Sequence, residues 1–253
     1  MADTLIDALN NIKTTRSNIA GSLSTVFGLS TNQNNTLASL VTAINGGVPY
    51  TVNSCAITMT KPLESASPRF FAVRGITEIN NCYTTNGSLN YTFDNNPQLL
   101  KISNIAGTIK SITATFNGCT KLTAIGTMDT SACSSFFNMF KNCSSLTQAP
   151  ELNVSGVTTS TSASAHSGMF SGCTALTTLT FTDENAWKFK ASVDFSSCPL
   201  THDVAVNLLN RLETMTADTT KSIIFSAATF ATLTTDEVAI GVDKFWTVSG
   251  ASA

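Results

Sequence analysis

Residues 140–146 read FKNCSSL, and this pattern of Phe, two residues, Cys, two residues and Leu recurs through the middle of the chain. Full copies stand at 116–122 (FNGCTKL) and 170–176 (FSGCTAL). A copy with Asn in the Cys position begins at Phe93, and a shortened copy begins at Phe195. The phenylalanines of successive copies lie 23, 24, 30 and 25 residues apart. A regular period of roughly 20–50 residues is typical of solenoids, so we predict an α/β solenoid with one turn per copy.

The repeated positions are interpreted as structural, because every turn of a solenoid buries equivalent side chains. Four of the seven cysteines share one such position, where a small apolar side chain with a weak S–H donor packs well. Disulfides or a metal site are the alternatives, but the cysteine count is odd, and the close pair Cys198 and His202 has no second pair to complete a site. We therefore predict no metal and no cofactor. The repeat positions are Phe116, Cys119, Leu122, Phe140, Cys143, Leu146, Phe170, Cys173, Leu176, Phe195, Cys198 and Leu200.

The composition narrows the classes of partner. Only 12% of the 253 residues are charged, about half the usual share, and the formal net charge is −2. No Lys/Arg cluster is present, which argues against a nucleic-acid partner. No stretch approaches the roughly 18 apolar residues that a membrane-spanning helix needs, so we predict no membrane insertion. The first residues, MADTL, lack the basic and apolar regions of a secretory signal, which favours a protein that is assembled in a cytoplasm.

The N-terminal region carries a heptad pattern. Its apolar residues step alternately by four and three, as in a coiled-coil helix, and Arg16 falls on this seam, where one polar residue can fix the oligomer state. We predict that residues 1–47, which end at Gly46-Gly47, form a helical oligomerisation or docking module. A homo-oligomer, most plausibly a trimer, is the favoured reading, and packing within one chain is the alternative. The seam consists of Leu5, Leu9, Ile12, Arg16, Ile19, Leu23 and Val26.

The rest of the chain divides into three parts. An open solenoid exposes its last hydrophobic layer, so its ends need atypical caps. We predict a β-rich N-terminal cap over 48–88, leucine-rich repeats over 89–200 and an α/β C-terminal cap over 201–253. The N-terminal cap should contain strands at 55–60 and 69–73, and a degraded first repeat at Ile76, Ile79 and Cys82.

Within the repeats, a short strand is expected after each Cys position, and these strands should stack as one parallel sheet on one face. Short helical turns at Met139-Phe140 and Met169-Phe170 should lie on the opposite face. In the C-terminal cap, Asp203 is expected to cap the first helix. The expected repeat strands are 99–102, 122–125, 146–149 and 176–181, and the expected cap elements are helices 203–213 and 234–242 and strands 221–226 and 245–249.

Two stretches resemble a known family. Residues 140–147 and 169–177 look like BspA-type leucine-rich repeats, and the tail from Leu200 through 233–237 to 245–248 resembles the cap of such proteins from gut bacteria and their phages. BspA-like proteins are associated with surfaces and adhesion. Without a secretion signal and behind a helical module, the repeats resemble phage virion proteins such as tail or head fibres.

This resemblance implies a structural or accessory virion protein, assembled in the host cytoplasm. Its repeats would present a surface for attachment to the particle or the host. The implied partners are other virion proteins and a host-surface receptor or glycan. The alternative is a bacterial BspA-like cell-surface adhesin whose secretion signal is not in this sequence.

Few residues point to catalysis. The two histidines, His166 and His202, belong to no recognised catalytic motif, so we predict no catalytic residues and no enzyme. A glycan-active enzyme, the third alternative, would need a carboxylate pair across a cleft. Asp183-Glu184 could ligate a cation in a turn. Trp187 could stack on a sugar ring, but the favoured reading is that it covers the edge of the solenoid. The longer loop Gly156–Ser167 is either a binding insertion or tolerated padding.

Overall fold

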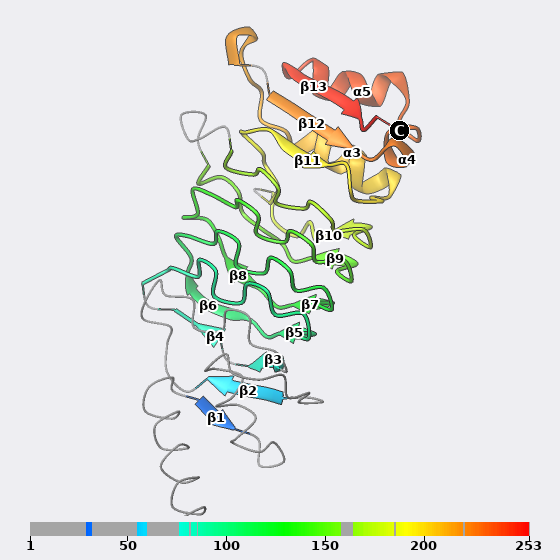
Figure 1. Cartoon of the computed structure of the whole chain (residues 1–253). Coiled ribbons are helices and arrows are strands. Elements are labelled where there is room, and N and C mark those ends of the chain that lie inside the picture. Colours follow the sequence, from blue (N-terminus) through cyan, green and yellow to red (C-terminus); the bar gives the residue numbers. More distant parts are fainter. Residues whose placement is uncertain are drawn as a thin grey trace, which may run out of the picture.

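The computed structural model describes residues 29–31, 55–59, 76–80, 82–84, 86–157, 164–184, 186–219 and 221–252. These residues form a mixed α/β fold with several small parallel sheets (Figure 1). The predicted seam from Leu5 to Val26, the strand predicted at 69–73 and the middle of the Gly156–Ser167 loop lie outside the described residues.

The largest sheet has the strand order β1-β2-β3-β5-β7. The strand β1 pairs with β2 in antiparallel fashion, and each later neighbour pairs in parallel. The strand predicted at 55–60 is confirmed over Cys55–Met59. The degraded first repeat is in register with the later ones, because Ile79 pairs with Ile102 and Ile102 pairs with Ile125. The bounds are β1 Leu29–Thr31, β2 Cys55–Met59, β3 Ile76–Asn80, β5 Lys101–Ile102 and β7 Ala124–Ile125.

The expected single sheet through all the repeats is interrupted. The strands β9 (Gln148–Ala149) and β10 (Thr178–Leu179) pair in parallel as predicted, but β9 is not hydrogen-bonded to β7. Each of these strands is two residues long, so very few backbone bonds join neighbours and the loss of one bridge divides the ladder. The prediction of short parallel strands is therefore confirmed, whereas the prediction that they form one continuous sheet was wrong.

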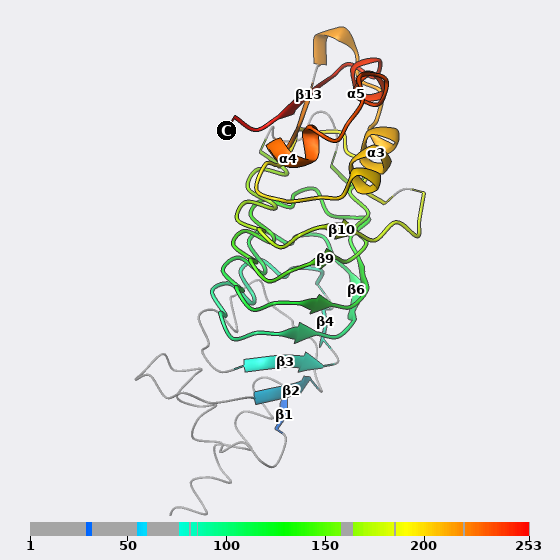
Figure 2. The same cartoon turned by 90° about the vertical axis from the view of Figure 1, so that its right-hand side faces the viewer.

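A second parallel sheet was not predicted. It has the order β4-β6-β8, and one or two residues separate each of its strands from the preceding strand of the first sheet. Its strands are β4 Cys82–Tyr83, β6 Ile105–Thr108 and β8 Met128–Asp129. The chain thus turns a corner at Ser103-Asn104 and again at Gly126-Thr127, and Figure 2 shows the strands of successive repeats lying one above another.

The repeated phenylalanines form one column through the core. The ring centroids are 5.7 Å apart for Phe93–Phe116, 5.6 Å for Phe116–Phe140 and 5.8 Å for Phe140–Phe170, with nearly parallel rings in each pair. The column continues through Phe195 into the C-terminal region. Every one of the predicted repeat positions is buried. Stacked aromatic rings at these separations add to the stability gained from burial alone.

The turns around this column are built on left-handed backbone conformations. The residues two before and two after the first four phenylalanines, from Phe93 to Phe170, have positive φ angles, as at Asn138 (53°) and Asn142 (61°) around Phe140. Gly and Asn adopt this conformation at least cost, which explains Gly118, Asn142 and Gly172 before the cysteines. The expected helical pieces at Met139-Phe140 and Met169-Phe170 are instead successive turns. Alternate N–H groups close these turns by donating to the carbonyl three residues earlier, as Met139 does to Phe136, whereas the N–H of Phe140 donates to Met169 of the next repeat.

Gly172→Ala is expected to lower the free energy of unfolding by at least about 1–2 kcal/mol, the cost of a left-handed non-glycine residue. Gly172 has a φ of 76°, and a Cβ there would lie 2.5 Å from Oδ1 of Asn142. The control is Asn142→Gly at the equivalent position of the previous repeat, where we expect a change below about 1 kcal/mol. Urea denaturation of the two variants measures the difference, and equal losses would contradict this view of the turns.

The C-terminal region closes the stack with helices and a three-stranded parallel sheet in the order β11-β12-β13 (Figure 1). Phe195 belongs to β11 and pairs with Phe225 of β12, so the last repeat continues directly into this sheet. The predicted cap strands and helices are confirmed, and α4 and β11 are additional. The bounds are β11 Val193–Phe195, α3 His202–Arg211, the 3₁₀ turn η1 Ala217–Thr219, β12 Lys221–Phe225, α4 Ala227–Phe230, α5 Thr235–Val242 and β13 Trp246–Gly250.

The helix starts follow partly from the sequence. Asp203 does not cap α3, because Thr201 is the N-cap residue and makes no side-chain capping bond, while Asp203 lies in the first turn. In α5, Thr234 and Glu237 form a reciprocal capping box, so the acidic pair at this helix start is structural. The apolar face of α3 and its C-cap residue are buried, and they comprise Val204, Leu208, Leu209 and Leu212.

Candidate functional site

The repeated cysteines bind the backbone of the previous repeat. Sγ of Cys119 donates to the carbonyl of Phe93 at 3.1 Å, and Sγ of Cys143 donates to the carbonyl of Phe116 at 3.1 Å. Cys173 does the same to Phe140 at 3.0 Å. Each thiol therefore satisfies a buried carbonyl as well as filling volume, and the interpretation of these positions as structural agrees with the geometry.

Burial also makes these thiols poor nucleophiles. It raises the pKa of Cys119 and Cys173 to about 12, and raises the pKa of Cys143 well above its ordinary value. The reactive form of cysteine is the thiolate, which is scarcely populated at neutral pH with such pKa values. The six described cysteines are all buried and free of disulfides.

We expect these thiols to react with a thiol reagent only after denaturant is added. Cys55 is replaced by Ser in this experiment, because its side chain is not described, so that every remaining thiol is one of the six. An aromatic disulfide reagent at pH 8 releases a chromophore for each thiol that reacts, so the absorbance gives the number of reacted thiols. Reaction of a thiol in the native protein at the rate of free cysteine would contradict this assignment.

Trp187 cannot be a surface ligand contact. The side chain has no exposed surface, its ring lies 6.0 Å from that of Phe170, and Nε1 donates to the carbonyl of Thr180 at 2.8 Å. The alternation of Trp187, Lys188, Phe189 and Lys190 places the aromatic residues inside and leaves the lysines partly exposed. The suggestion of sugar stacking at Trp187 is therefore wrong, and the reading that it packs against the repeats holds.

The turn at Asp183-Glu184 is held by protein groups. The Glu151 carboxylate accepts from the N–H groups of Thr182 and Asp183 and from the Thr182 hydroxyl. Nη1 of Arg211 donates to the carbonyl of Asp183 at 2.6 Å. Within the described ranges no group of three or more His, Cys, Asp or Glu side chains is arranged to hold a metal ion.

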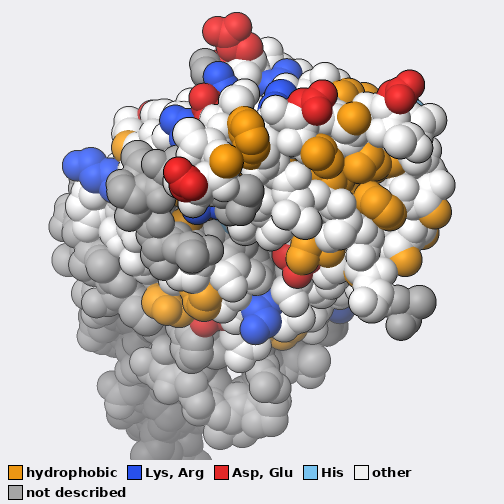
Figure 3. Space-filling model, turned by 90° about the horizontal axis from the view of Figure 1, so that it is seen from above, with side chains coloured by type: hydrophobic (Ala, Val, Ile, Leu, Met, Phe, Trp, Pro, Cys, Tyr) orange, Lys and Arg blue, Asp and Glu red, His pale blue; other side chains and the backbone are white. Residues whose placement is uncertain are grey.

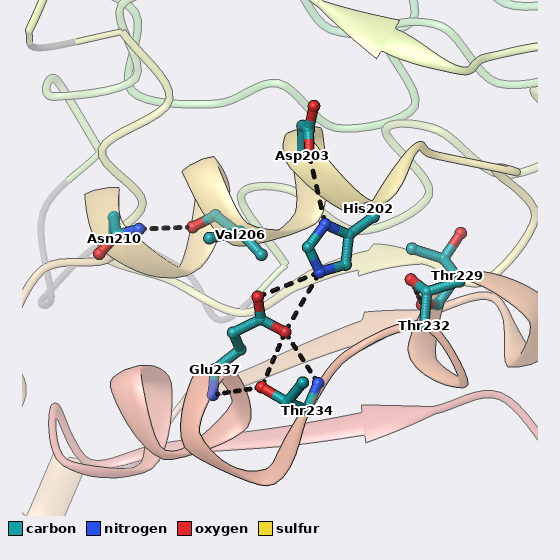
Figure 4. Close-up of polar contacts among 8 residues, drawn as sticks. All are labelled: His202, Asp203, Val206, Asn210, Thr229, Thr232, Thr234 and Glu237. Carbon is teal, nitrogen blue, oxygen red and sulfur yellow. Dashed lines mark hydrogen bonds and ion pairs between the residues drawn. The ribbon is translucent and has the colours of Figure 1, made fainter.

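His202 links α3 to α5 at the surface. Figure 4 shows its ring between two carboxylates, with Nε2 3.1 Å from Oε1 of Glu237 and Nδ1 3.3 Å from Oδ1 of Asp203. Hydrogen bonds to Asp203 and Glu237 raise the pKa of His202. Bonds from Thr234 lower the pKa of Glu237. The cluster fastens two cap helices together, which accounts for it without catalysis.

His166 lies in the core. It stands four residues before Phe170, where the other repeats have Leu89, Ile112 and Phe136. Its side chain has no exposed surface, its ring meets that of Phe189 edge-on at 4.9 Å, and Nδ1 lies 3.3 Å from the carbonyl of Ala191. Burial lowers the pKa of His166 to about 4, so the ring is neutral at physiological pH.

An open groove of about 670 Å³ crosses the corner between the two sheets of the first repeats. Its outward-facing positions on β6 and β7 are small, with Ala106 and Ala124 exposed and Gly126 at the corner. Larger polar side chains border it, namely Tyr83, Lys101 and Asn104. We take this corner groove as the candidate functional site. The sequence alone did not indicate it, because its residues come together only through the register of β4, β5, β6 and β7.

Gly126 and Asn104 fix the shape of the corner groove. Oδ1 of Asn104 accepts a bond from the N–H of Thr127 at 3.0 Å, which ties one repeat to the next. A Cβ on Gly126 would lie within 2.5 Å of the backbone nitrogen of Asn104. The close approach of the two corners therefore requires glycine, and the missing side chain leaves the groove open.

A second surface feature lies on the C-terminal region. Val242 at the end of α5 is 52% exposed and Phe245 is 44% exposed, and Figure 3 shows hydrophobic side chains gathered on this end of the molecule. Phe245 also has a φ of 62°, a conformation that disfavours a bulky residue. Trp246 beside it is buried, with Nε1 donating to the carbonyl of Glu213.

Comparisons of the chain with protein-family models, with curated proteins and with solved structures find no match. In the described part of the chain, the helices are too short and too polar to cross a bilayer.

Proposed function

We propose that the chain is a leucine-rich-repeat solenoid of the BspA type that serves as a structural or accessory phage virion protein, as in a tail or head fibre. It would present its repeats for attachment to the particle or to the host surface. The observation that carries this proposal is the unbroken phenylalanine column, with each repeat cysteine bonded to the previous repeat. Such a column supports an extended scaffold whose surface, and not its repeated motif, is available for binding.

The chemistry of the described side chains also supports a binding role. The buried thiols, His166 and Trp187 are used in packing, and Glu237 takes part in the capping box of α5. The surface is rich in Ser, Thr and Asn and carries few charges, which suits recognition by hydrogen bonds at short range. A virion protein that is present in many copies gains further, because linked weak sites bind with an increased effective concentration.

The test of this function uses particles. Mass spectrometry of purified phage from the host culture should detect the protein, and antibodies against it should label the particles in electron micrographs. A protein found only on the bacterial surface, with no copies in particles, would overturn the proposal and favour the adhesin. Turnover of glycans by the purified protein would overturn the proposal that its role is structural and not enzymatic.

The predicted docking role of residues 1–47 is tested in the full chain. Leu9→Lys together with Ile19→Lys changes two seam positions and should reduce both the sedimentation coefficient and the incorporation into particles. The matched control, Asn11→Lys together with Asn18→Lys, adds the same two charges beside the seam and should leave both unchanged. Unaltered sedimentation and incorporation of the seam variant would contradict the docking role.

A further inference from the structure

We propose that the corner groove binds an acidic saccharide, that is, a sugar ring bearing a carboxylate. The inference rests on the proposed attachment function, since it names the class of ligand that the attachment surface would take. The site is formed by Tyr83, Lys101, Asn104, Ile125 and Gly126. Its size and composition meet the usual requirements for a small-ligand site, which has a volume of about 300–1,000 Å³ and a few convergent polar groups.

The polar groups that border the groove are mainly hydrogen-bond donors. Lys101 offers its ammonium group, Asn104 offers the amide N–H groups that remain once Oδ1 has accepted from Thr127, and Tyr83 offers its hydroxyl. Donors that line one groove favour a ligand rich in acceptor oxygens. Sugars carry such oxygens on their hydroxyl and carboxylate groups.

The charge of the groove favours an acid. Lys101 forms no ion pair in the described structure, and none of the groove-lining residues is Asp or Glu. Glu78 stands opposite Lys101 in the strand register but is not paired with it. An ammonium group in a groove without a bound carboxylate is complementary to an anionic ligand, and a charge-assisted hydrogen bond is stronger than a neutral one.

The remaining surface suits the flat, apolar side of a sugar ring. Ile125 and the half-buried Tyr83 provide apolar area, and Ala106, Ala124 and Gly126 leave room above the backbone. An aromatic ring with a hydroxyl at its edge can contact the C–H groups of a sugar with its face and the sugar's oxygens with its hydroxyl. The groove thus combines an apolar surface, hydrogen-bond donors and one positive charge at a single corner of the fold.

The experiment is calorimetric titration of the full chain with two probes, a trimer of galacturonic acid and the neutral trimer maltotriose. We expect the acidic trimer to bind at least about tenfold more tightly at low salt, and we expect this preference to shrink as salt is added. Lys101→Met should remove the preference, and Tyr83→Ala should weaken binding of both trimers. The matched controls are Lys110→Met and Tyr91→Ala, two exposed side chains outside the groove, which should bind as the unaltered chain does.

Failure of this inference can be told apart from failure of the proposed function. No binding of either trimer at millimolar concentration, or equal binding of both with no effect of Lys101→Met, would overturn the saccharide site. Either result leaves the detection of the protein in particles unaffected. Conversely, absence from particles would overturn the virion role even if the trimer bound at the groove.

Discussion

Phe140→Ala is expected to lower the free energy of unfolding by about 3–5 kcal/mol, the usual cost of truncating a buried phenylalanine. The Phe140 ring lies between those of Phe116 and Phe170, at 5.6 and 5.8 Å, and has no exposed surface. The substitution therefore removes ring contacts on both sides and leaves a cavity in the middle of the stack. A loss of this size is a large fraction of the roughly 5–15 kcal/mol that stabilises a typical domain.

The matched control for this substitution is Phe245→Ala. Phe245 is 44% exposed, so its truncation removes far less contact and should cost less than about 1 kcal/mol. Urea denaturation followed by circular dichroism gives both values. Equal losses at the two positions, or a loss below about 1 kcal/mol at Phe140, would contradict the role of the column in stability.

The second large effect is a loss of stability in acid caused by His166. Its pKa is lowered to about 4 by burial, whereas in the unfolded chain it returns to its ordinary value of 6.5. A histidine that is buried neutral contributes full stability above pH 6.5, and the contribution falls as the pH drops toward 4. From these two values we expect a loss of about 2 kcal/mol between pH 7 and pH 5.

His166→Leu isolates this effect, because Leu89 occupies the same position in an earlier repeat. The variant should lack the 2 kcal/mol fall, so the difference between the two chains should widen from pH 7 to pH 5. The measurement is the urea midpoint at several pH values. Parallel curves for the two chains would contradict the assignment.

His202 acts in the opposite direction and is the same in both chains. Bonds to Asp203 and Glu237 raise its pKa, so its contribution to stability is complete below the ordinary value and is lost as the pH rises through the raised one. The difference in stability between the unaltered chain and His166→Leu therefore does not contain the contribution of His202, nor that of the exposed carboxylates, because both chains share them.

The part of the fold that could be predicted from the sequence is the stack of repeats, because side chains of the same size recur at its buried positions. The Phe, Cys and Leu positions recur at a near-constant period, and each is buried where the pattern places it. The strand at Lys221–Phe225 and the helix that begins after Thr234 were likewise predictable, since they carry an apolar run and a capping box. These features depend on local pattern, which the sequence displays directly.

The parts that were missed depend on contacts between repeats. The second sheet uses Ile105–Thr108, a stretch with two small residues and weak strand preference, and pairing with the neighbouring repeats makes it a strand. The residue type of Asp203 favours a cap, but the N-cap residue of α3 is Thr201, two residues earlier. For Trp187 the favoured reading, a position against the solenoid, agrees with its buried side chain and with its alternation with Lys188.

The corner groove could not be predicted for a similar reason. Tyr83, Lys101 and Gly126 lie in three successive repeats, and only the strand register brings them to one corner. Small side chains at Ala106 and Ala124 have no special meaning in the sequence. In the fold, larger side chains on the adjoining strands surround these two alanines, and this difference in size forms the groove.

Anomalous diffraction from the native sulfur atoms of crystals of the full chain tests the central claim most directly. The stack predicts one row of sulfur peaks for Cys119, Cys143, Cys173 and Cys198, with steps of about 5 Å, the spacing of neighbouring strands. Scattered sulfur positions, or two of these sulfurs at the bonded distance of about 2 Å, would contradict it.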